Sequence, residues 1–192
     1  MENIKEQRSN ELIESNMGNY EQIDNVKEML IEMFQQHINE QIVFMCIGTD
    51  QSTGDSFGPF VGKYLIECNF PYPVYGTIEH PVDALNLKQI LDMINIKYDN
   101  PIIVAIDASV AKERHIGKIY FKQGALRPGK YGMKILPLVG DYHLSAVVNV
   151  RDSIIRLKKL HETRLHVILQ LSLKVASLLF EANYIAKKEL DK

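Results

Sequence analysis

Residues 44–62 read FMCIGTDQSTGDSFGPFVG and join three different patterns. The apolar run at 42–47 is short enough to be a buried strand. A loop rich in Gly, Ser, Thr and Asp follows, and apolar residues at helical spacing begin next to Pro59. Proline favours the first helical turn, because its missing N–H would have no intrahelical partner there. The segment therefore predicts a strand, a polar loop and a helix, and open α/β sheets bind ligands beyond such strand ends.

The loop has an aspartate at the position where a phosphate-binding loop has a lysine. A P-loop ends in Gly-Lys-Ser/Thr, whereas Gly54 is followed here by Asp55 and Ser56. The G-x-G-x-x-G pattern of a dinucleotide-binding loop is also missing from this segment. Two interpretations stay open. Asp50 and Asp55 either present acid to a proton or a metal ion, or they serve as turn residues and helix caps.

Helical and strand patterns alternate along the first 110 residues. Helical spacing at 20–38, at 60–68 and after Asp83 alternates with apolar runs at 42–47, 73–78 and 102–106. This order predicts a three-layer α/β/α fold with a mostly parallel sheet, in which the first and last runs are adjacent central strands. Further along, we expect a hairpin-like addition to the sheet at 117–139, including an extended run at 134–139. Helices are expected at 144–160 and 164–190.

Composition narrows the class of protein. The 192 residues predict a polar segment at 1–18 and a single domain at 19–192. A net charge of −2 argues against binding nucleic acid through its phosphates. The polar start does not resemble a signal peptide, and no uncharged stretch is long enough to cross a membrane. Cys46 and Cys68 are expected to be buried and reduced. These features predict a cytoplasmic protein.

Asp107 directly follows the apolar run at 102–106, as Asp55 follows the run at 42–47. Neighbouring parallel strands place their carboxyl ends on one rim, so the two carboxyl groups could share a proton like an aspartic dyad. Alternatively, each aspartate caps a turn. His80 and His143 also follow strand-like segments and could complete a metal site with the aspartates, although a solvated histidine is the commoner case.

The chain resembles the YyaC family of sporulation proteins, whose members are described as candidate spore proteases. The resemblance spans roughly residues 40–180 and is carried by CIGTDQSTGDSFGPFVG, VYGTIEHPVDALNL, IIVAIDASV, GKIYFKQGALRPGK, LPLVGDYHLSAVVNV and TRLHVILQLS. YyaC proteins are in turn similar to germination protease, an aspartic endopeptidase that degrades small acid-soluble spore proteins. Its catalytic aspartates match Asp55, in Asp-Ser-Phe-Gly-Pro, and Asp107, in Asp-Ala. This chain is much shorter than germination protease.

A more distant resemblance links the chain to hydrogenase maturation endopeptidases. Those enzymes hold nickel with an acidic loop residue, an aspartate after a strand and a later histidine, which His143 loosely matches. Where they have Gly-Asn after the first strand, this chain has Gly48-Thr49-Asp50. Both resemblances imply a phosphorylase/hydrolase-like α/β/α fold.

The resemblance implies an aspartic-type endopeptidase of sporulation or germination, with Asp55 and Asp107 as catalytic residues. Asp50, Thr53, His80 and His143 are the expected substrate-binding residues. The expected partner is a protein or peptide substrate, such as small acid-soluble spore proteins, without cofactor, metal, nucleic acid or membrane. The expected location is the cytoplasm of the mother cell or the spore interior. A homodimer is expected through the broad apolar face of 164–190. The alternatives are a metal-dependent maturation-type peptidase and a non-catalytic binding or regulatory module.

Overall fold

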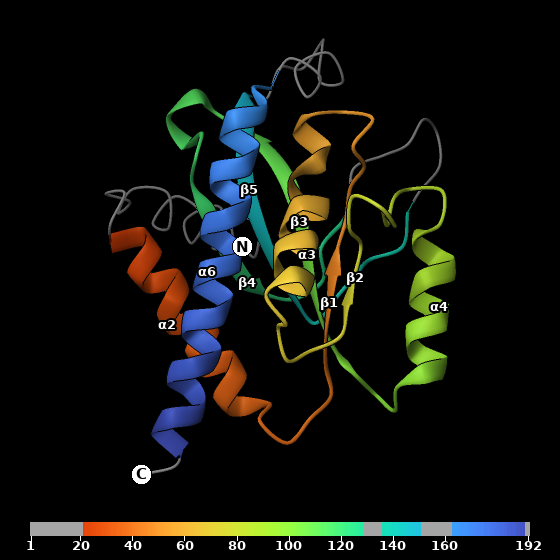
Figure 1. The fold of residues 1–192 in the computed structure, drawn as a ribbon, viewed down its shortest axis with the longest axis vertical. Helices are drawn as coiled ribbons and strands as arrows, with labels where there is room; N and C mark the ends of the chain where they lie inside the picture. Colours follow the sequence, from red (N-terminus) through yellow and green to blue (C-terminus); the bar gives the residue numbers. More distant parts are fainter. Residues whose placement is uncertain (1–20, 129–135, 151–162, 191–192) are drawn as a thin grey trace, which may run out of the picture.

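A computed structural model describes residues 21–128, 136–150 and 163–190 of the chain (Figure 1). The predicted segment at 1–18 lies outside these residues. The regular elements are α2 (Glu21–Gln36), β1 (Ile42–Cys46), the 3-10 turn η1 (Gly54–Ser56), α3 (Phe57–Glu67), β2 (Val74–Tyr75), α4 (Leu87–Lys97), β3 (Ile102–Ala111), the 3-10 turn η2 (Glu113–His115), β4 (Ile119–Gln123), β5 (Tyr142–Val150) and α6 (Leu165–Leu190).

The five strands form one mostly parallel sheet in the order β2-β1-β3-β5-β4. β1 pairs in parallel with both β2 and β3, and β3 pairs in parallel with β5. β4 is antiparallel to β5. Ile42 is in register with Ile102, and Cys46 with Ile106. The prediction that these two apolar runs are adjacent strands inside a parallel sheet is therefore confirmed.

Helices cover both faces of the sheet. One face buries Phe44, Val104 and Leu144 against α2, α3 and α6. The other face buries Val43 and Ile103 together with apolar residues of α4 and of the segment 136–139. β1 is fully buried, as its continuous apolar sequence predicts for a strand covered on both sides. The three-layer α/β/α arrangement is thus the observed fold.

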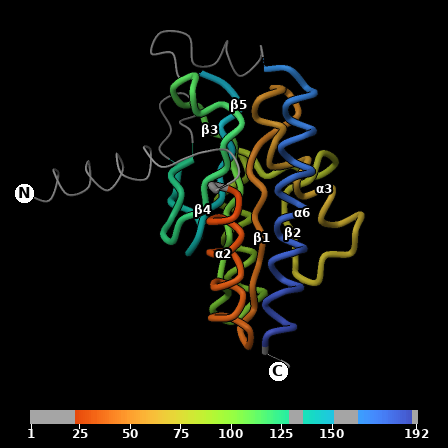
Figure 2. Tube along the Cα trace, turned by 90° about the vertical axis from the view of Figure 1, so that its left-hand side faces the viewer, coloured from red at the N-terminus to blue at the C-terminus, as the bar shows by residue number. Residues whose placement is uncertain are grey.

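α6 is the longest helix in the described part of the chain. By length and composition alone, Leu165–Glu189 could cross a membrane. In the fold, however, α6 lies beside α3 on one side of β1 and also contacts α2 (Figures 1 and 2). Ile168, Val175 and Leu179 are buried, and Ser172 donates a hydrogen bond to the carbonyl oxygen of Phe57 at 3.1 Å. α6 is therefore a core helix that fastens the start of α3.

The second half of the chain departs from the sequence prediction. Residues 142–150 form strand β5, so the predicted helix at 144–160 is wrong as far as the structure describes it, and 151–160 lie outside. β5 lies between β3 and β4 in the sheet, and burial alternates along its first half before Ala146, Val147 and Val148 are all buried. Residues 136–138 form no strand, and Leu136 is buried in the core beside α4. Val139 pairs with Leu126 in an isolated antiparallel bridge. Residues 134–135 lie outside the description.

Both cysteines are free, but only one of them is buried. Cys46 is the last residue of β1 and is fully buried, and this burial raises the pKa of its thiol far above the ordinary value. Cys68, at the end of α3, is exposed. The prediction of a buried Cys68 is therefore wrong, since the helix turns this position toward solvent.

Candidate active site

Asp55 lies in η1, the short turn between β1 and α3. The Asp55 N–H donates to the Ser52 carbonyl at 3.0 Å, and its carbonyl accepts from the Thr49 N–H at 3.1 Å. These backbone bonds close the loop on itself, and they leave Asp55 half-buried at the carboxyl end of β1. These backbone bonds therefore hold Asp55 in a defined place at the end of β1.

Two glycines let this turn approach the strand. A Cβ on Gly48 would lie 1.9 Å from the Asp55 carbonyl oxygen, and Gly48 has φ +143°. A Cβ on Gly58 would lie 2.2 Å from the Ile47 carbonyl oxygen. Any larger residue would push the turn away, since real Cβ atoms do not approach other atoms so closely. Glycines at 48 and 58 thus fix Asp55 next to the end of β1.

Asp107 lies within β3 rather than at its end, because β3 continues to Ala111. Its partner strand β1 stops earlier: the last β1 residue pairs with Ile106, whose carbonyl accepts from the Ile47 N–H at 2.7 Å. On its other side Asp107 is in register with Ser145 of β5. Asp107 is half-buried, and its Oδ1 accepts from the Ala108 N–H at 2.8 Å.

The two aspartates belong to one rim of the sheet. Asp107 is the first residue of β3 beyond its pairing with β1, which is also where the chain leaves β1 for the loop of Asp55. The turn that carries Asp55 contacts β3 directly. The structure thus brings the elements carrying both residues together, as the strand pattern predicts.

The other predicted site residues near this rim differ in how exposed they are and in which hydrogen bonds they make. Asp50 is exposed, and Thr53 is half-buried, with its carbonyl accepting from the Ser56 hydroxyl at 2.6 Å. His80 is exposed in the loop after β2, where its N–H donates to Thr77 Oγ1 at 3.1 Å. The same loop reaches the end of β1, because the Gly48 N–H donates to the Val82 carbonyl at 2.8 Å.

Glu79 connects the loop after β2 to α3. Its carboxylate lies 3.2 Å from the Lys63 ammonium, and Lys63 also pairs with Glu67 at 2.7 Å. A hydrogen bond to its own backbone, and then the bond to Lys63, lower the pKa of Glu79. This surface contact ties the loop of His80 to the helix that begins next to Asp55.

His143 lies on the same sheet face as Asp107, but nearer to the amino ends of the strands. It is in register with Ala105, two residues before Asp107, and side chains alternate along a strand. Its Nδ1 lies 2.8 Å from the Gly124 carbonyl. Within residues 21–128, 136–150 and 163–190, no three or more His, Cys, Asp and Glu side chains are arranged to hold a metal ion. Asp55, Asp107 and His143 therefore do not fit the nickel site of the maturation enzymes.

Ser52 is a site residue that the sequence pattern did not single out. It lies three residues before Asp55 and is only 6% exposed. Its Oγ is buried and has no hydrogen-bond partner, the one such side-chain atom in the described part of the chain. Serine is common in exposed loops, so its burial could not be read from the sequence. A hydroxyl left in this state destabilises the loop that presents Asp55.

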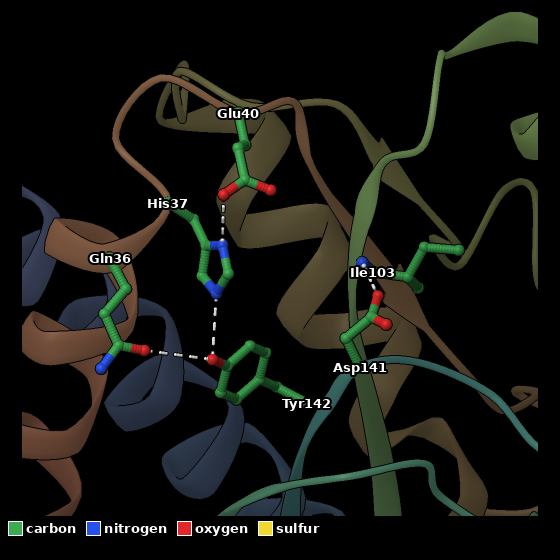
Figure 3. A network of polar contacts seen from close by, with 6 residues as sticks. All are labelled: Gln36, His37, Glu40, Ile103, Asp141 and Tyr142. Atoms are coloured by element: carbon green, nitrogen blue, oxygen red, sulfur yellow. Dashed lines mark hydrogen bonds and ion pairs between the residues drawn. The ribbon is translucent and has the colours of Figure 1, made fainter.

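The opposite end of the sheet carries other polar features. A hollow of ≈ 600 Å³ lies at the amino end of β3, lined by residues that include Asn95, Asp99 and Asp141. Nearby, a polar network joins α2 to β5 (Figure 3). These features lie at the amino ends of the strands, away from Asp55 and Asp107. They are therefore separate from the rim where parallel sheets bind their ligands.

Comparison with known proteins agrees with this architecture. Residues 14–178 match the family described as "Protein of unknown function (DUF1256)". The chain belongs to the DUF1256 family. It is 35% identical over 148 residues to the Bacillus subtilis (strain 168) protein YyaC, which is described as uncharacterized. That alignment covers 77% of this chain and 72% of YyaC. The resemblance of this DUF1256 chain to YyaC is confirmed.

The fold of this DUF1256 chain is similar to that of a solved structure. It is the crystal structure of the [NiFe] hydrogenase maturation protease HycI from Thermococcus kodakarensis KOD1. The TM-score is 0.51 at 19% sequence identity, and the match covers 79% of this chain and 99% of HycI. The chain therefore has a peptidase-like fold.

Proposed function

We propose that this protein is an aspartic-type endopeptidase in which Asp55 and Asp107 act as a paired acid and base. The observation that carries the proposal is their common rim: the turn that carries Asp55 contacts β3, and Asp107 is the first residue of β3 beyond its pairing with β1. Two carboxyl groups brought close together do not both ionise, so one keeps a proton. A pair that holds a single proton has both the base and the acid that peptide hydrolysis needs.

The reaction proposed for this pair is general acid–base hydrolysis. The ionised carboxylate takes a proton from a water molecule while the water oxygen bonds to the carbonyl carbon of the scissile peptide. The protonated carboxyl group then gives its proton to the amide nitrogen, and the C–N bond breaks. The products are a carboxylic acid and an amine, and the pair again holds one proton, now on the other residue.

The proposed substrate is a protein or peptide chain that lies across the carboxyl rim. Asp50 and His80 are exposed on the two loops that border this rim, so both are in reach of a bound chain. The resemblance to the spore protease families suggests small acid-soluble spore proteins as substrates, in the cytoplasm of a sporulating cell. The half-buried Thr53 and His143 are the proposed inner contacts.

Incubating the purified full chain with small acid-soluble spore proteins tests this function. We expect cleavage by the wild type and none by Asp55→Asn or Asp107→Asn, because an amide keeps the shape of the side chain but cannot take or give the proton. Asp99→Asn, at an exposed position near the opposite end of the sheet, is the matched control and should cleave normally. Circular dichroism should show all variants folded.

Two results would contradict the assignment. Retained cleavage in either active-site variant would show that the pair is not the catalytic dyad. Loss of cleavage after treatment with a metal chelator, restored by adding nickel or zinc, would favour the maturation-type chemistry instead. A wild-type protein that binds the substrate without cleaving it would favour the non-catalytic binding module.

A further inference from the structure

The outer surface of α4 carries an apolar patch that lies away from the aspartate rim. Leu85 and Ile96 are 69% and 87% exposed, and Met93 between them is 42% exposed. With Lys88, Gln89 and Asp92 they line a shallow hollow of ≈ 570 Å³. We call these six residues the α4 patch. Large exposed apolar side chains gathered on one surface indicate an interaction site, whereas scattered ones do not.

α4 stands apart from the other helices. α2, α3 and α6 pack together on one face of the sheet, whereas α4 covers the other face by itself among the described helices (Figure 1). The inner side of α4 packs against the sheet, because Leu87 and Ile94 are buried there. The α4 patch therefore is not needed to bury the core, and its exposed apolar area requires another explanation.

The arrangement of the patch is self-complementary. Leu85, in the turn before α4, and Ile96, in the last turn of α4, lie at the two ends of the patch. When two copies of α4 run antiparallel about a two-fold axis, Leu85 of each copy faces Ile96 of the other. The patch also holds one cation and one anion, Lys88 and Asp92, which pair at 2.7 Å within the chain. Neither charge is repelled by a second patch, because each meets its opposite across the axis.

We propose that the α4 patch is the site at which a second copy of this chain docks, with the two α4 helices antiparallel. A two-fold contact of this kind uses the same surface on both subunits. One pair of three-turn helices lies at the small end of stable interfaces, so the dimer forms with a dissociation constant on the order of micromolar. The α6 face expected from the sequence is available only in part, because Ile168, Val175 and Leu179 are buried inside the chain, whereas Leu165 and Leu173 are exposed.

Sedimentation equilibrium of the full chain, from about 5 to 500 µM, tests the dimer. We expect a concentration-dependent monomer–dimer equilibrium, and Ile96→Lys should weaken it at least about tenfold, since it places a charge against the apolar Leu85 of the other copy. Leu173→Lys is the matched control, because Leu173 is a 49% exposed apolar residue on α6. This control should dimerise like the wild type. A monomer at every concentration, or an unchanged dimer in Ile96→Lys, would overturn the proposal.

The charges and the orientation have separate tests. Lys88→Asp and Asp92→Lys should each weaken the dimer, and the double swap should restore it. In a Cys68→Ser background, mixing Leu85→Cys with Ile96→Cys should give a heterodimer with a short bis-maleimide linker, whereas Ile96→Cys alone should react poorly. Efficient linking of Ile96→Cys alone would indicate a parallel contact and overturn the antiparallel arrangement. Failure of the double swap to restore the dimer would overturn the charge argument.

Discussion

Two buried serines show how much the partner of a single hydroxyl matters in this fold. Ser172 of α6 is fully buried and donates to the Phe57 carbonyl. Ser52, in the Asp55 loop, is 6% exposed, and its Oγ has no partner among the described residues. A hydrogen-bonded hydroxyl adds about 1 kcal/mol to stability, whereas an unpaired buried one costs about 1–3 kcal/mol. The two residues therefore have opposite effects on the same fold.

Replacing these serines by alanine should shift stability in opposite directions. Ser52→Ala should raise the free energy of unfolding by about 1 kcal/mol, because it removes an unpaired buried hydroxyl. Ser172→Ala should lower it by about 1 kcal/mol, because the Phe57 carbonyl loses its donor. Urea denaturation monitored by circular dichroism measures both values. Destabilisation of similar size in both variants would show that Ser52 has a hydrogen-bond partner in solution.

At the scale of elements, α6 decides how the helical layer is built. One of its sides packs against α2 and α3, and Lys27 of α2 also pairs with Glu181 of α6 at 2.7 Å. Its other side carries exposed apolar residues such as Leu165 and Leu173. The long apolar sequence of this helix is therefore explained by contacts within the chain on one side only.

Truncating leucines on the two sides of α6 should separate these roles. Leu179 is fully buried, so Leu179→Ala should lower the free energy of unfolding by about 2–5 kcal/mol through lost contacts and a cavity. Leu173→Ala should change it by less than about 0.5 kcal/mol, because Leu173 is half-exposed. Chemical denaturation gives both numbers. Equal costs at the two positions would mean that the exposed side of α6 is also covered in solution.

At the scale of the whole molecule, a hydrogen-bond network connects the helical layer to the sheet (Figure 3). We call this network of Gln36, His37, Glu40 and Tyr142 the clasp. The Tyr142 hydroxyl, at the start of β5, donates to Gln36 Oε1 at 3.3 Å and lies 3.0 Å from His37 Nε2. The other ring nitrogen of His37 lies 2.9 Å from Glu40. Burial, and then the negative charges of Asp141 and Glu40, raise the pKa of Tyr142. The clasp thus requires a neutral tyrosine.

This clasp should make stability fall at alkaline pH. The raised pKa in the folded state means that the contribution of Tyr142 is complete below the unfolded-state pKa of about 10 and is lost as pH rises through the folded-state value. Tyr142→Phe should be about 1 kcal/mol less stable at pH 7, because two hydrogen bonds are lost. This difference should shrink above about pH 10, where only the wild type must ionise a buried phenol.

Urea denaturation at pH values from about 7 to 11 tests the clasp. Tyr184→Phe is the control for a surface hydroxyl, since Tyr184 is exposed on α6, and it should change stability at pH 7 by less than about 0.5 kcal/mol. A difference between wild type and Tyr142→Phe that stays constant across the range would contradict the assigned role of Tyr142.

Local patterns in the sequence were enough to predict the first half of the molecule. β1 and β3 are continuous apolar runs because both their faces are covered, and such runs are visible without any knowledge of their partners. The Gly and Asp residues between β1 and α3 predicted a turn that presents Asp55 at the carboxyl end of a strand. The pairing of this turn with the strand of Asp107 followed from the parallel order of the sheet.

Tertiary contacts decided the second half. Residues 142–150 have apolar positions that fit a helix as well as a strand, and they become β5 because β3 and β4 supply hydrogen-bond partners on both sides. The same pairing extends β3 past Asp107 and places Ser145 beside it. Burial of Ser52 and exposure of Ile96 likewise depend on neighbours distant in sequence. A sequence pattern records the periodicity of a segment, whereas register and burial are set by the segments that pack against it.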